Sequence, residues 1–335
     1  MVRFLSIVLA VLVGLVVGAG CDRSAPVAAV GAGAEGTGGG DEARARVVVL
    51  SPGLAVTMRD LGLGELLVGR HGFDAWSDPG LPVCGDQSGI DYERLLAVRP
   101  THILVQWGQR ELPARLTEMA GRHGWEVRSM NPLSLEEVRS AAADLVAMFG
   151  AGEEGEEALA AFDGALRRRE GVDLSRAGRV MLLDAVSPPG VIGPGSYHDD
   201  VLRRIGGTPA VTQGAAYIVM DAEDVLALRP DAIVVLLPRT PRSGGAGEAG
   251  PGGASRTGVL PREEWASVLG ALARLNIPAV TRGRVALIDD PECLLPATSL
   301  GRFAEDLARI LEGWAMEEEA AGEPRGAGAA GRSSP

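Results

Sequence analysis

Short apolar runs alternate with segments of helical periodicity along the middle of the chain. Runs that are apolar at nearly every position are typical of strands buried on both faces of a parallel sheet. Such runs lie at 46–50, 102–106, 179–184, 232–237 and 284–288. Helical periodicity is found at 111–121, 134–148, 263–273 and 298–313. The alternation predicts an α/β fold with crossover helices.

An internal repeat is the most informative feature of this pattern. Residues 91–105 (DYERLLAVRPTHILV) align without a gap with residues 221–235 (DAEDVLALRPDAIVV), and eight of the fifteen positions are identical. Each copy has the pattern of a short helix with an aspartate N-cap, stopped before a proline and followed by a buried strand. The copies start 130 residues apart, which is the size of a lobe rather than of a solenoid repeat. We therefore predict two similar lobes, at 46–150 and 173–315.

A helical segment separates the two predicted lobes. Residues 151–172 are acidic at their start and basic at their end, which suits the dipole of a helix. A helix of ~20 residues spans about 30 Å, long enough to cross the back of both lobes. The predicted fold class is therefore α/β, with two Rossmann-like lobes joined by a single long backbone helix. Each lobe is expected to be a mostly parallel sheet with flanking helices.

The start of the chain has a different character. Arg3 precedes a wholly uncharged, apolar stretch at 4–19, which is the pattern of an export signal. The stretch is shorter than the ~20 residues that span a bilayer comfortably. Small residues lead directly to Cys21, as in the lipobox of bacterial lipoproteins, although Gly18 stands where that motif usually has a branched residue. We predict a signal peptide at 1–20 and acylation of Cys21, which would anchor the protein to a membrane.

Three further segments have too few bulky apolar residues to form a core. Residues 21–45 are predicted to be a flexible tether and residues 316–335 a disordered tail. The Gly-rich stretch within 239–258 lacks the Lys-Ser/Thr of a phosphate-binding loop and is expected to be a flexible surface insertion.

Charge and motifs exclude several classes of function. The net charge of −12 and the pI near 4.9 provide no basic stripe for nucleic acid. Gly-x-Ser-x-Gly, P-loop and His-Glu-x-x-His motifs are absent from the sequence, so we do not expect an enzyme. A free-metal site would need convergent histidines and carboxylates, and no adequate set is visible. The four histidines are His71, His102, His123 and His198.

Cys84 and Cys293 remain once Cys21 is assigned to the lipid. Outside the cytoplasm two such cysteines could form a disulfide, stay free and buried, or act as soft metal ligands. The sequence leaves these three alternatives open.

Several short motifs, in their order and spacing, resemble the cobalamin, haem and iron-siderophore binding proteins of ABC importers. The resemblance covers residues 46 to about 313. Its motifs are Leu50-Ser-Pro52, Leu61-Gly62 with Leu67-Val-Gly69, Gly85-Asp86 leading to residues 91–100, and the segments 193–207 and 283–290. It implies a lipid-anchored monomer on the outer face of the cytoplasmic membrane. In a bacterium with an outer membrane this location is the periplasm. Such a receptor would capture a cobalt- or iron-containing chelate and pass it to an ABC permease and ATPase, with no cofactor or resident metal of its own.

The resemblance also implies where the permease would dock. In that family a glutamate on each lobe meets arginines of the permease, and the matching positions here are Glu93 and Glu223. Both lie at the same offset of the internal repeat, as expected for docking on a two-fold symmetric transporter. The alternative is that they are ordinary solvated residues on a helix surface.

The ligand is expected between the lobes, at loops that follow the strand ends. The candidates are Phe73, Trp76, Gln87, Trp107, Gln109, Tyr197 and His198, with the loop 290–295 beside them. Core packing is the alternative for the two tryptophans. The family often has Thr-Glu where Ala55-Val56 stands here, and cobalamin binders tend to carry an aromatic residue at the position of Gln87. These departures leave the identity of the chelate open.

Two other functions fit the same lobes. A membrane-tethered sensor or scaffold would use the fold without transport. A free-metal receptor, or a haem or corrinoid receptor with His71 or His198 as axial ligand, is a further alternative.

Overall fold

The computed structural model describes residues 44–108, 110–239 and 255–322. Both predicted lobes lie within one compact unit, Arg44–Pro335. The predicted signal peptide, Cys21, Gln109 and most of the predicted insertion lie outside the described residues. None of the helices in the described ranges is long and apolar enough to cross a membrane.

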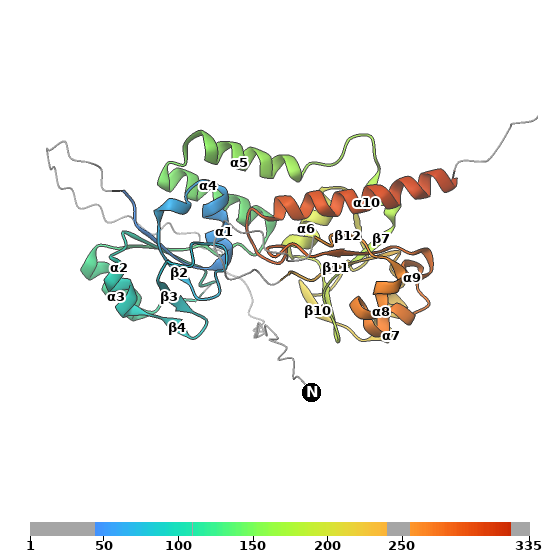
Figure 1. The fold of residues 1–335 in the computed structure, drawn as a ribbon, viewed down its shortest axis with the longest axis horizontal. Helices are drawn as coiled ribbons and strands as arrows, with labels where there is room; N and C mark the ends of the chain where they lie inside the picture. The colour runs from blue at the N-terminus through green and yellow to red at the C-terminus, as the bar shows by residue number, and fades with distance from the viewer. Residues whose placement is uncertain (1–43, 109, 240–254, 323–335) are drawn as a thin grey trace, which may run out of the picture. The chain divides into compact units, whose positions relative to one another are not determined.

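The first lobe is built on a six-stranded sheet in which all neighbours are parallel except the last pair, β3 and β4 (Figure 1). Strands β1 and β5 are the most apolar, and β6 at the edge carries charged residues. In spatial order the strands are β4 (Gly89–Ile90), β3 (Val83–Asp86), β2 (Leu67–His71), β1 (Val47–Leu50), β5 (His102–Val105) and β6 (Glu126–Ser129).

Helices cover both faces of this sheet, because successive side chains of a strand point to opposite faces. Val47 and Val49 of β1 pack with α1 and α4, and Val48 packs with α2 and α3. The helices are α1 (Pro52–Asp60), α2 (Tyr92–Val98), α3 (Ala114–His123) and α4 (Leu135–Phe149), with a 3-10 turn, η1, at Gly64–Leu66.

The second lobe is built on a seven-stranded sheet of mixed direction. Its core strands β7, β11 and β13 are parallel, and β8, β10 and β12 are added antiparallel. The order is β10 (Tyr217–Val219), β8 (Pro189–Ile192), β7 (Arg179–Val186), β11 (Ala232–Leu236), β13 (Val285–Ile288) and β12 (Gly258–Val259), with β9 (Thr208–Pro209) paired to β7.

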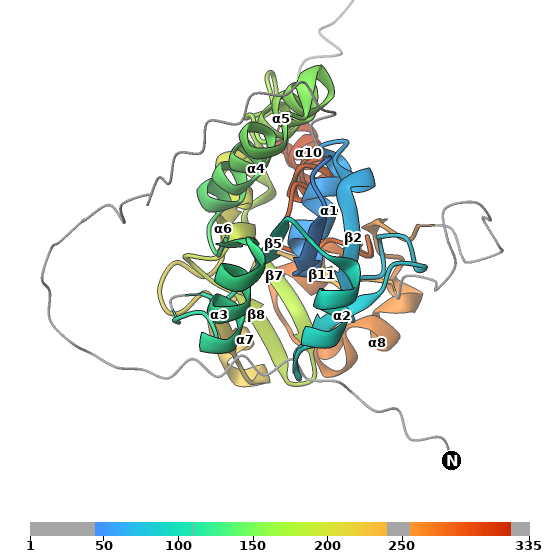
Figure 2. The ribbon, with the colours of Figure 1, turned by 90° about the vertical axis from the view of Figure 1, so that its left-hand side faces the viewer.

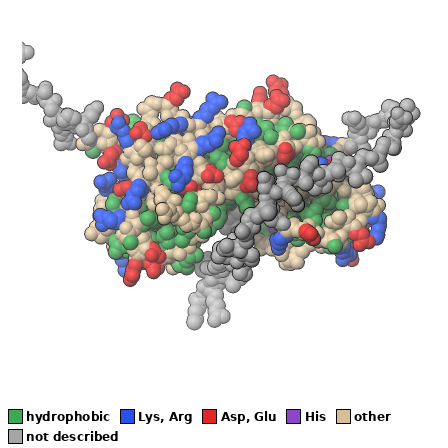
Figure 3. Space-filling view, turned by 180° about the vertical axis from the view of Figure 1, so that it is seen from behind, with side chains coloured by type: hydrophobic (Ala, Val, Ile, Leu, Met, Phe, Trp, Pro, Cys, Tyr) green, Lys and Arg blue, Asp and Glu red, His purple; other side chains and the backbone are tan. Residues whose placement is uncertain are grey.

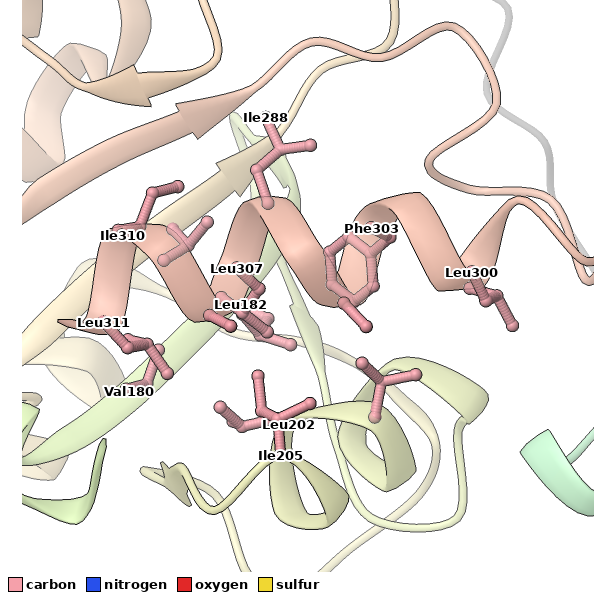
Figure 4. Packing of buried hydrophobic residues seen from close by; sticks show 14 of the residues in the cluster. Val180, Leu182, Leu202, Ile205, Ile288, Leu300, Phe303, Leu307, Ile310 and Leu311 are labelled. Carbon is pink, nitrogen blue, oxygen red and sulfur yellow. The ribbon is translucent and has the colours of Figure 1, made fainter. Parts of the chain in front are cut away.

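Two groups of helices sandwich this second sheet. The long helix α10 (Leu300–Gly322) and α6 (Tyr197–Arg204) bury one face, where Phe303 and Leu307 meet Leu182 and Leu202 (Figure 4). The other face is covered by α7 (Ala222–Leu228), α8 (Trp265–Val268) and α9 (Pro278–Arg282). Both lobes are thus three-layered, which confirms the predicted α/β class.

Two predictions need correction in this lobe. The segment 263–273 is not one helix but two 3-10 turns, η3 (Arg262–Glu264) and η4 (Gly270–Arg274), on either side of α8. Gly270 interrupts it with a φ of +57°, a left-handed conformation.

The second correction concerns the tail predicted from residue 316. α10 continues to Gly322, where Glu318 pairs with the buried Arg284 and Glu319 lies 3.1 Å from Arg176. Ion pairs with the lobe therefore keep this acidic end helical.

Helices α4 and α5 (Gly152–Ala165) connect the lobes by packing into both cores. Leu135 and Val138, near the start of α4, belong to the core of the second lobe, whereas Ala142 and Leu145 belong to that of the first. In Figure 2 the two helices lie together at the side where α10 also lies. The predicted connecting helix is thus reinforced by a second one.

The helical part of the connection is shorter than the predicted 151–172. α5 ends at Ala165, and a 3-10 turn, η2 (Leu174–Ala177), follows. Leu166 and Leu174 both enter the core of the second lobe, and Gly171, with a φ of +81°, allows the chain to turn between them.

Acidic, basic and apolar side chains are interspersed on the face of the molecule seen in Figure 3. Such a mixture is ordinary for the surface of a folded protein, much of which is contributed by apolar atoms.

Candidate functional site

The carboxyl ends of the parallel strands lie together at one edge of each sheet. In the first lobe Leu50 of β1 is in register with Val105 of β5, so Ser51 and Gln106 follow at the same level. In the second lobe Leu236 pairs with Ile288, and Asp289 follows there. Ligands of open parallel sheets bind outside such edges, where loops and helix N-termini meet.

Ser51 organises the edge of the first lobe. Its hydroxyl accepts from the Leu54 N–H at 3.4 Å as the N-cap of α1, and it donates to Gln106 Oε1 at 2.9 Å. Pro52 occupies the first helical turn, where a missing N–H costs nothing. The Leu50-Ser-Pro52 motif therefore starts a helix and holds the loop after β5.

Trp107 comes next in this loop and is only partly buried. Its ring packs against the first-lobe core beside Val105, and the Arg110 guanidinium lies 5.4 Å from the ring centroid. The ring thus contacts both the core and a cation. Contact of Trp107 with a ligand stays a prediction.

Phe73 and Gln87 lie at the same edge, after β2 and β3. Phe73 is 57% exposed, its N–H donates to His71 Nδ1 at 3.1 Å, and the two rings are 5.7 Å apart. Gln87 is exposed in the turn between β3 and β4. Burial lowers the pKa of His71, against the opposing effect of Asp86. Phe73, Gln87 and Trp107 therefore follow three parallel strands, β2, β3 and β5, at one edge of the sheet, with β1 between β2 and β5.

Trp76 lies elsewhere. Asp74 accepts the N–H groups of Trp76 and Ser77 at 2.9 and 3.1 Å, which turns the chain away from the strand ends. Trp76 lines a separate pocket of about 410 Å³ with Arg59 and with Leu67, the first residue of β2. The structure thus does not bring Trp76 together with Phe73 at the predicted edge.

His198 is a core residue in this structure. It is fully buried, its Nε2 is 2.7 Å from the Cys293 carbonyl oxygen, and its ring meets that of Phe303 edge-on at 5.0 Å. Burial lowers the pKa of His198 to about 4. The side chain offers no surface to a ligand, which corrects the expectation from its Gly-Pro-Gly-Ser turn. Tyr197 is also buried, and its hydroxyl donates to the Leu294 carbonyl at 2.8 Å.

The two remaining cysteines are free and buried, one in each lobe. Burial raises the pKa of the Cys84 thiol to about 11 and that of Cys293 to about 12. Over the ranges that the structure describes, no three His, Cys, Asp or Glu side chains are arranged to hold a metal ion.

The lobes meet in an ionic cluster that the sequence did not reveal. Arg59 and Asp60, at the end of α1, face Glu292 and Arg302 of the second lobe. Arg59 donates to both oxygens of Glu292, at 2.5 and 3.0 Å, and Arg302 also pairs with Glu292. Thr298 Oγ1 donates to Asp60 Oδ2 at 2.8 Å. Because the partners are more than 200 positions apart, no local pattern marks them.

The repeat helices α2 and α7 have the same construction. Asp91 accepts the Arg94 N–H at 2.9 Å, and Asp221 accepts those of Glu223 and Asp224 at 2.8 Å. Each side chain thereby caps a helix N-terminus. Glu93 and Glu223 are exposed on these helices.

Both helices end on an arginine in the left-handed region, Arg99 with φ 46° and Arg229 with φ 49°. They are the non-glycine residues with positive φ in the described ranges. In each lobe a second arginine, next to the start of β1 or β7, stabilises this turn by hydrogen bonds to its backbone carbonyls. Arg46 donates to the Val98 and Arg99 carbonyls, and Arg179 does the same for Leu228 and Arg229. In Figures 1 and 2, α2 and α7 lie on the side opposite α5 and α10.

Solved structures share this fold. The periplasmic haem-binding protein RhuT of Roseiflexus sp. RS-1 is 20% identical with a TM-score of 0.58, over 81% of this chain and 99% of that one. A periplasmic haem-binding protein of Pseudomonas aeruginosa is 23% identical with a TM-score of 0.57, over 81% and 93%. The vitamin B12 binding protein BtuF of Vibrio cholerae is 17% identical with a TM-score of 0.53, over 82% and 97%.

No curated protein matches the sequence at a significant level. A family model described as periplasmic binding protein matches residues 47–268. This range contains both copies of the repeat and the helices that connect the lobes. The chain therefore belongs to the periplasmic binding protein family, whose members bind solutes.

Proposed function

We propose that the protein is the extracytoplasmic substrate-binding component of an ABC importer and that it captures a metal chelate between its lobes. The chelate classes are a corrinoid, haem or a ferric siderophore. The family match supports a binding role, and the similar structures include haem- and B12-binding proteins. The observation that carries the proposal is the pair of repeat helices, α2 and α7, each with an exposed glutamate at the same position.

The chelate would contact the edge of the first lobe. Phe73 offers an exposed ring, Trp107 a partly exposed one and Gln87 an amide, all after parallel strands of the same sheet. Aromatic faces suit a flat macrocycle or catecholate. Gln109, two positions after Trp107 in the sequence, stays a candidate. A binding role needs no catalytic group, and we propose that the protein is not an enzyme.

Docking would use Glu93 and Glu223, one on each lobe. Two carboxylates on similarly built helices suit a permease made of two related halves. Charges of this kind speed and orient association more than they strengthen it. We further propose that the protein acts as a monomer, held on the outer face of the cytoplasmic membrane by a lipid on Cys21.

A ligand screen tests the proposal. The protein would be titrated with cobalamin, cobinamide, haemin and ferric siderophores, and followed by tryptophan quenching and absorbance. We expect saturable binding of one chelate class at micromolar affinity or better. Phe73→Ala should weaken that binding roughly tenfold, since a buried aromatic contact is worth about 1.4 kcal/mol or more.

Met316→Ala is the matched control, because Met316 is 61% exposed, close to the value of Phe73, but belongs to α10, away from the carboxyl ends of the first-lobe strands. It should bind as the wild type does. Folded protein that binds none of the panel would contradict the chelate assignment.

A further inference from the structure

Each of the two repeat helices carries an exposed leucine one turn after its glutamate. Leu96 follows Glu93, and Leu226 follows Glu223, at the i+3 spacing that places two side chains on one helix face. The leucines are 43% and 41% exposed. A carboxylate and an apolar side chain thus stand side by side on each lobe.

A single exposed leucine needs no explanation. Here, however, the exposed leucine is the same in both copies of the repeat, although other positions of the two helices differ. Core positions of the helices have changed, since Leu95 corresponds to Val225 and Val98 to Leu228. The exposed glutamate and leucine are identical in both copies. Packing within the lobe therefore does not account for the leucine, which points outward in both.

The second lobe adds an apolar pocket beside its leucine. The pocket has a volume of about 500 Å³ and is lined by Ile218, Val219, Met220, Asp224, Ala227 and Leu228, between the edge strand β10 and α7. Val219 is 75% exposed there. Asp224 and Glu223 make its surroundings acidic.

We propose that these residues form a two-part docking surface in which the leucines, rather than the carboxylates, set how long the complex lasts. The proposal rests on the proposed function, because the occupant is the membrane permease of the importer. Its surface would present, at two sites, a basic side chain to the glutamate and an apolar one to the leucine. At the second lobe a larger apolar side chain would enter the pocket at Val219.

In this arrangement the glutamates and the leucines affect different rate constants of docking. Attraction between charges acts over about 8 Å in physiological salt and therefore governs the association rate. Apolar contact forms only at close range, so its loss appears in the dissociation rate. The two contributions can be measured separately in one binding experiment.

The test uses the full-length protein and its organism's ABC permease complexes in lipid nanodiscs, with association and dissociation followed at several salt concentrations. The double variant Leu96→Ala/Leu226→Ala should dissociate roughly fivefold faster for each leucine, with unchanged association rate and salt dependence. Val219→Ser, a change in β10 rather than in either repeat helix, should act in the same direction. Met316→Ala, on α10 at the side opposite α2 and α7, serves as the exposed apolar control.

Glu93→Gln/Glu223→Gln provides the contrasting result. It should slow association and flatten the salt dependence while leaving dissociation nearly unchanged. Wild-type dissociation in the leucine and Val219 variants, with slowed association in the glutamate variant, would overturn the inference and leave the importer role intact. Wild-type kinetics in all variants, or no docking by the wild type, would count against the proposed function itself.

Discussion

Arg59 of the first lobe donates two hydrogen bonds to Glu292 of the second, Nη1 to Oε1 at 2.5 Å and Nη2 to Oε2 at 3.0 Å. Paired contacts of this geometry are the strongest form of arginine–carboxylate interaction. Glu292 is almost fully buried, and Arg302 pairs with it as well. The contact therefore fixes the second-lobe loop 290–295 against the end of α1.

Glu292→Ala should destabilise the protein by about 1–3 kcal/mol. Two arginines would lose their shared acceptor, and the loss is moderated because Arg59 and Arg302 are partly exposed. Urea unfolding measures the change. Glu65→Ala, which removes the exposed pair with Arg44, is the control and should change stability by less than about 0.5 kcal/mol. Equal effects of the two substitutions would contradict the role of Glu292.

Stability should fall as the pH drops from about 6.5 toward 4. Burial lowers the folded-state pKa of His198 to about 4, so the unfolded chain binds a proton more readily in that window. The loss amounts to roughly 3 kcal/mol when complete, at 1.36 kcal/mol per pKa unit. Urea midpoints from pH 4 to 7 would show it. His198→Gln should flatten the slope but not abolish it, because burial lowers the pKa of His71 too.

Neither Cys84 nor Cys293 should react with a thiol reagent in the native protein at pH 8. Burial raises both pKa values, to about 11 and about 12, and excludes the reagent. Ellman's reagent should react with both thiols once urea is added. Rapid reaction in native buffer would show that one of them is accessible, and no reaction in urea would show that they are oxidised.

Arg99→Val and Arg229→Val should each destabilise the protein by about 1–2 kcal/mol. A β-branched side chain tolerates a positive φ poorly, and both residues are left-handed. Asparagine accepts this conformation, so Arg99→Asn and Arg229→Asn should have much smaller effects. Thermal unfolding of the four variants compares them. A valine variant as stable as its asparagine counterpart would mean that the turn relaxes.

The parts of the fold that were predictable are those with a local signal. The five predicted strands and the repeat helices are present, because apolar runs and capping residues act within a few positions. β2 was not predicted, since Gly69 and Arg70 interrupt its apolar pattern. In the structure Gly69 is needed there, because a Cβ would come within 2.5 Å of Cys84 Sγ.

The candidate site was predictable to a smaller extent. Phe73, Gln87 and Trp107 follow strand ends, so order along the chain places them at one edge. Trp76 and His198 were predicted in the same region. The turn capped by Asp74 places Trp76 elsewhere, and His198 is buried under helix packing. The cluster around Glu292 depends on contacts between lobes, which a single sequence does not display.

Helix α4 has one end in each core, since Leu135 packs in the second lobe and Leu145 in the first. Neither core is complete without the same continuous helix. A cut between the predicted lobes would therefore leave two fragments with open apolar surfaces, not two autonomous domains. The protein should lose its structure in one cooperative step, and a defect in either lobe should lower the resistance of the other to proteases.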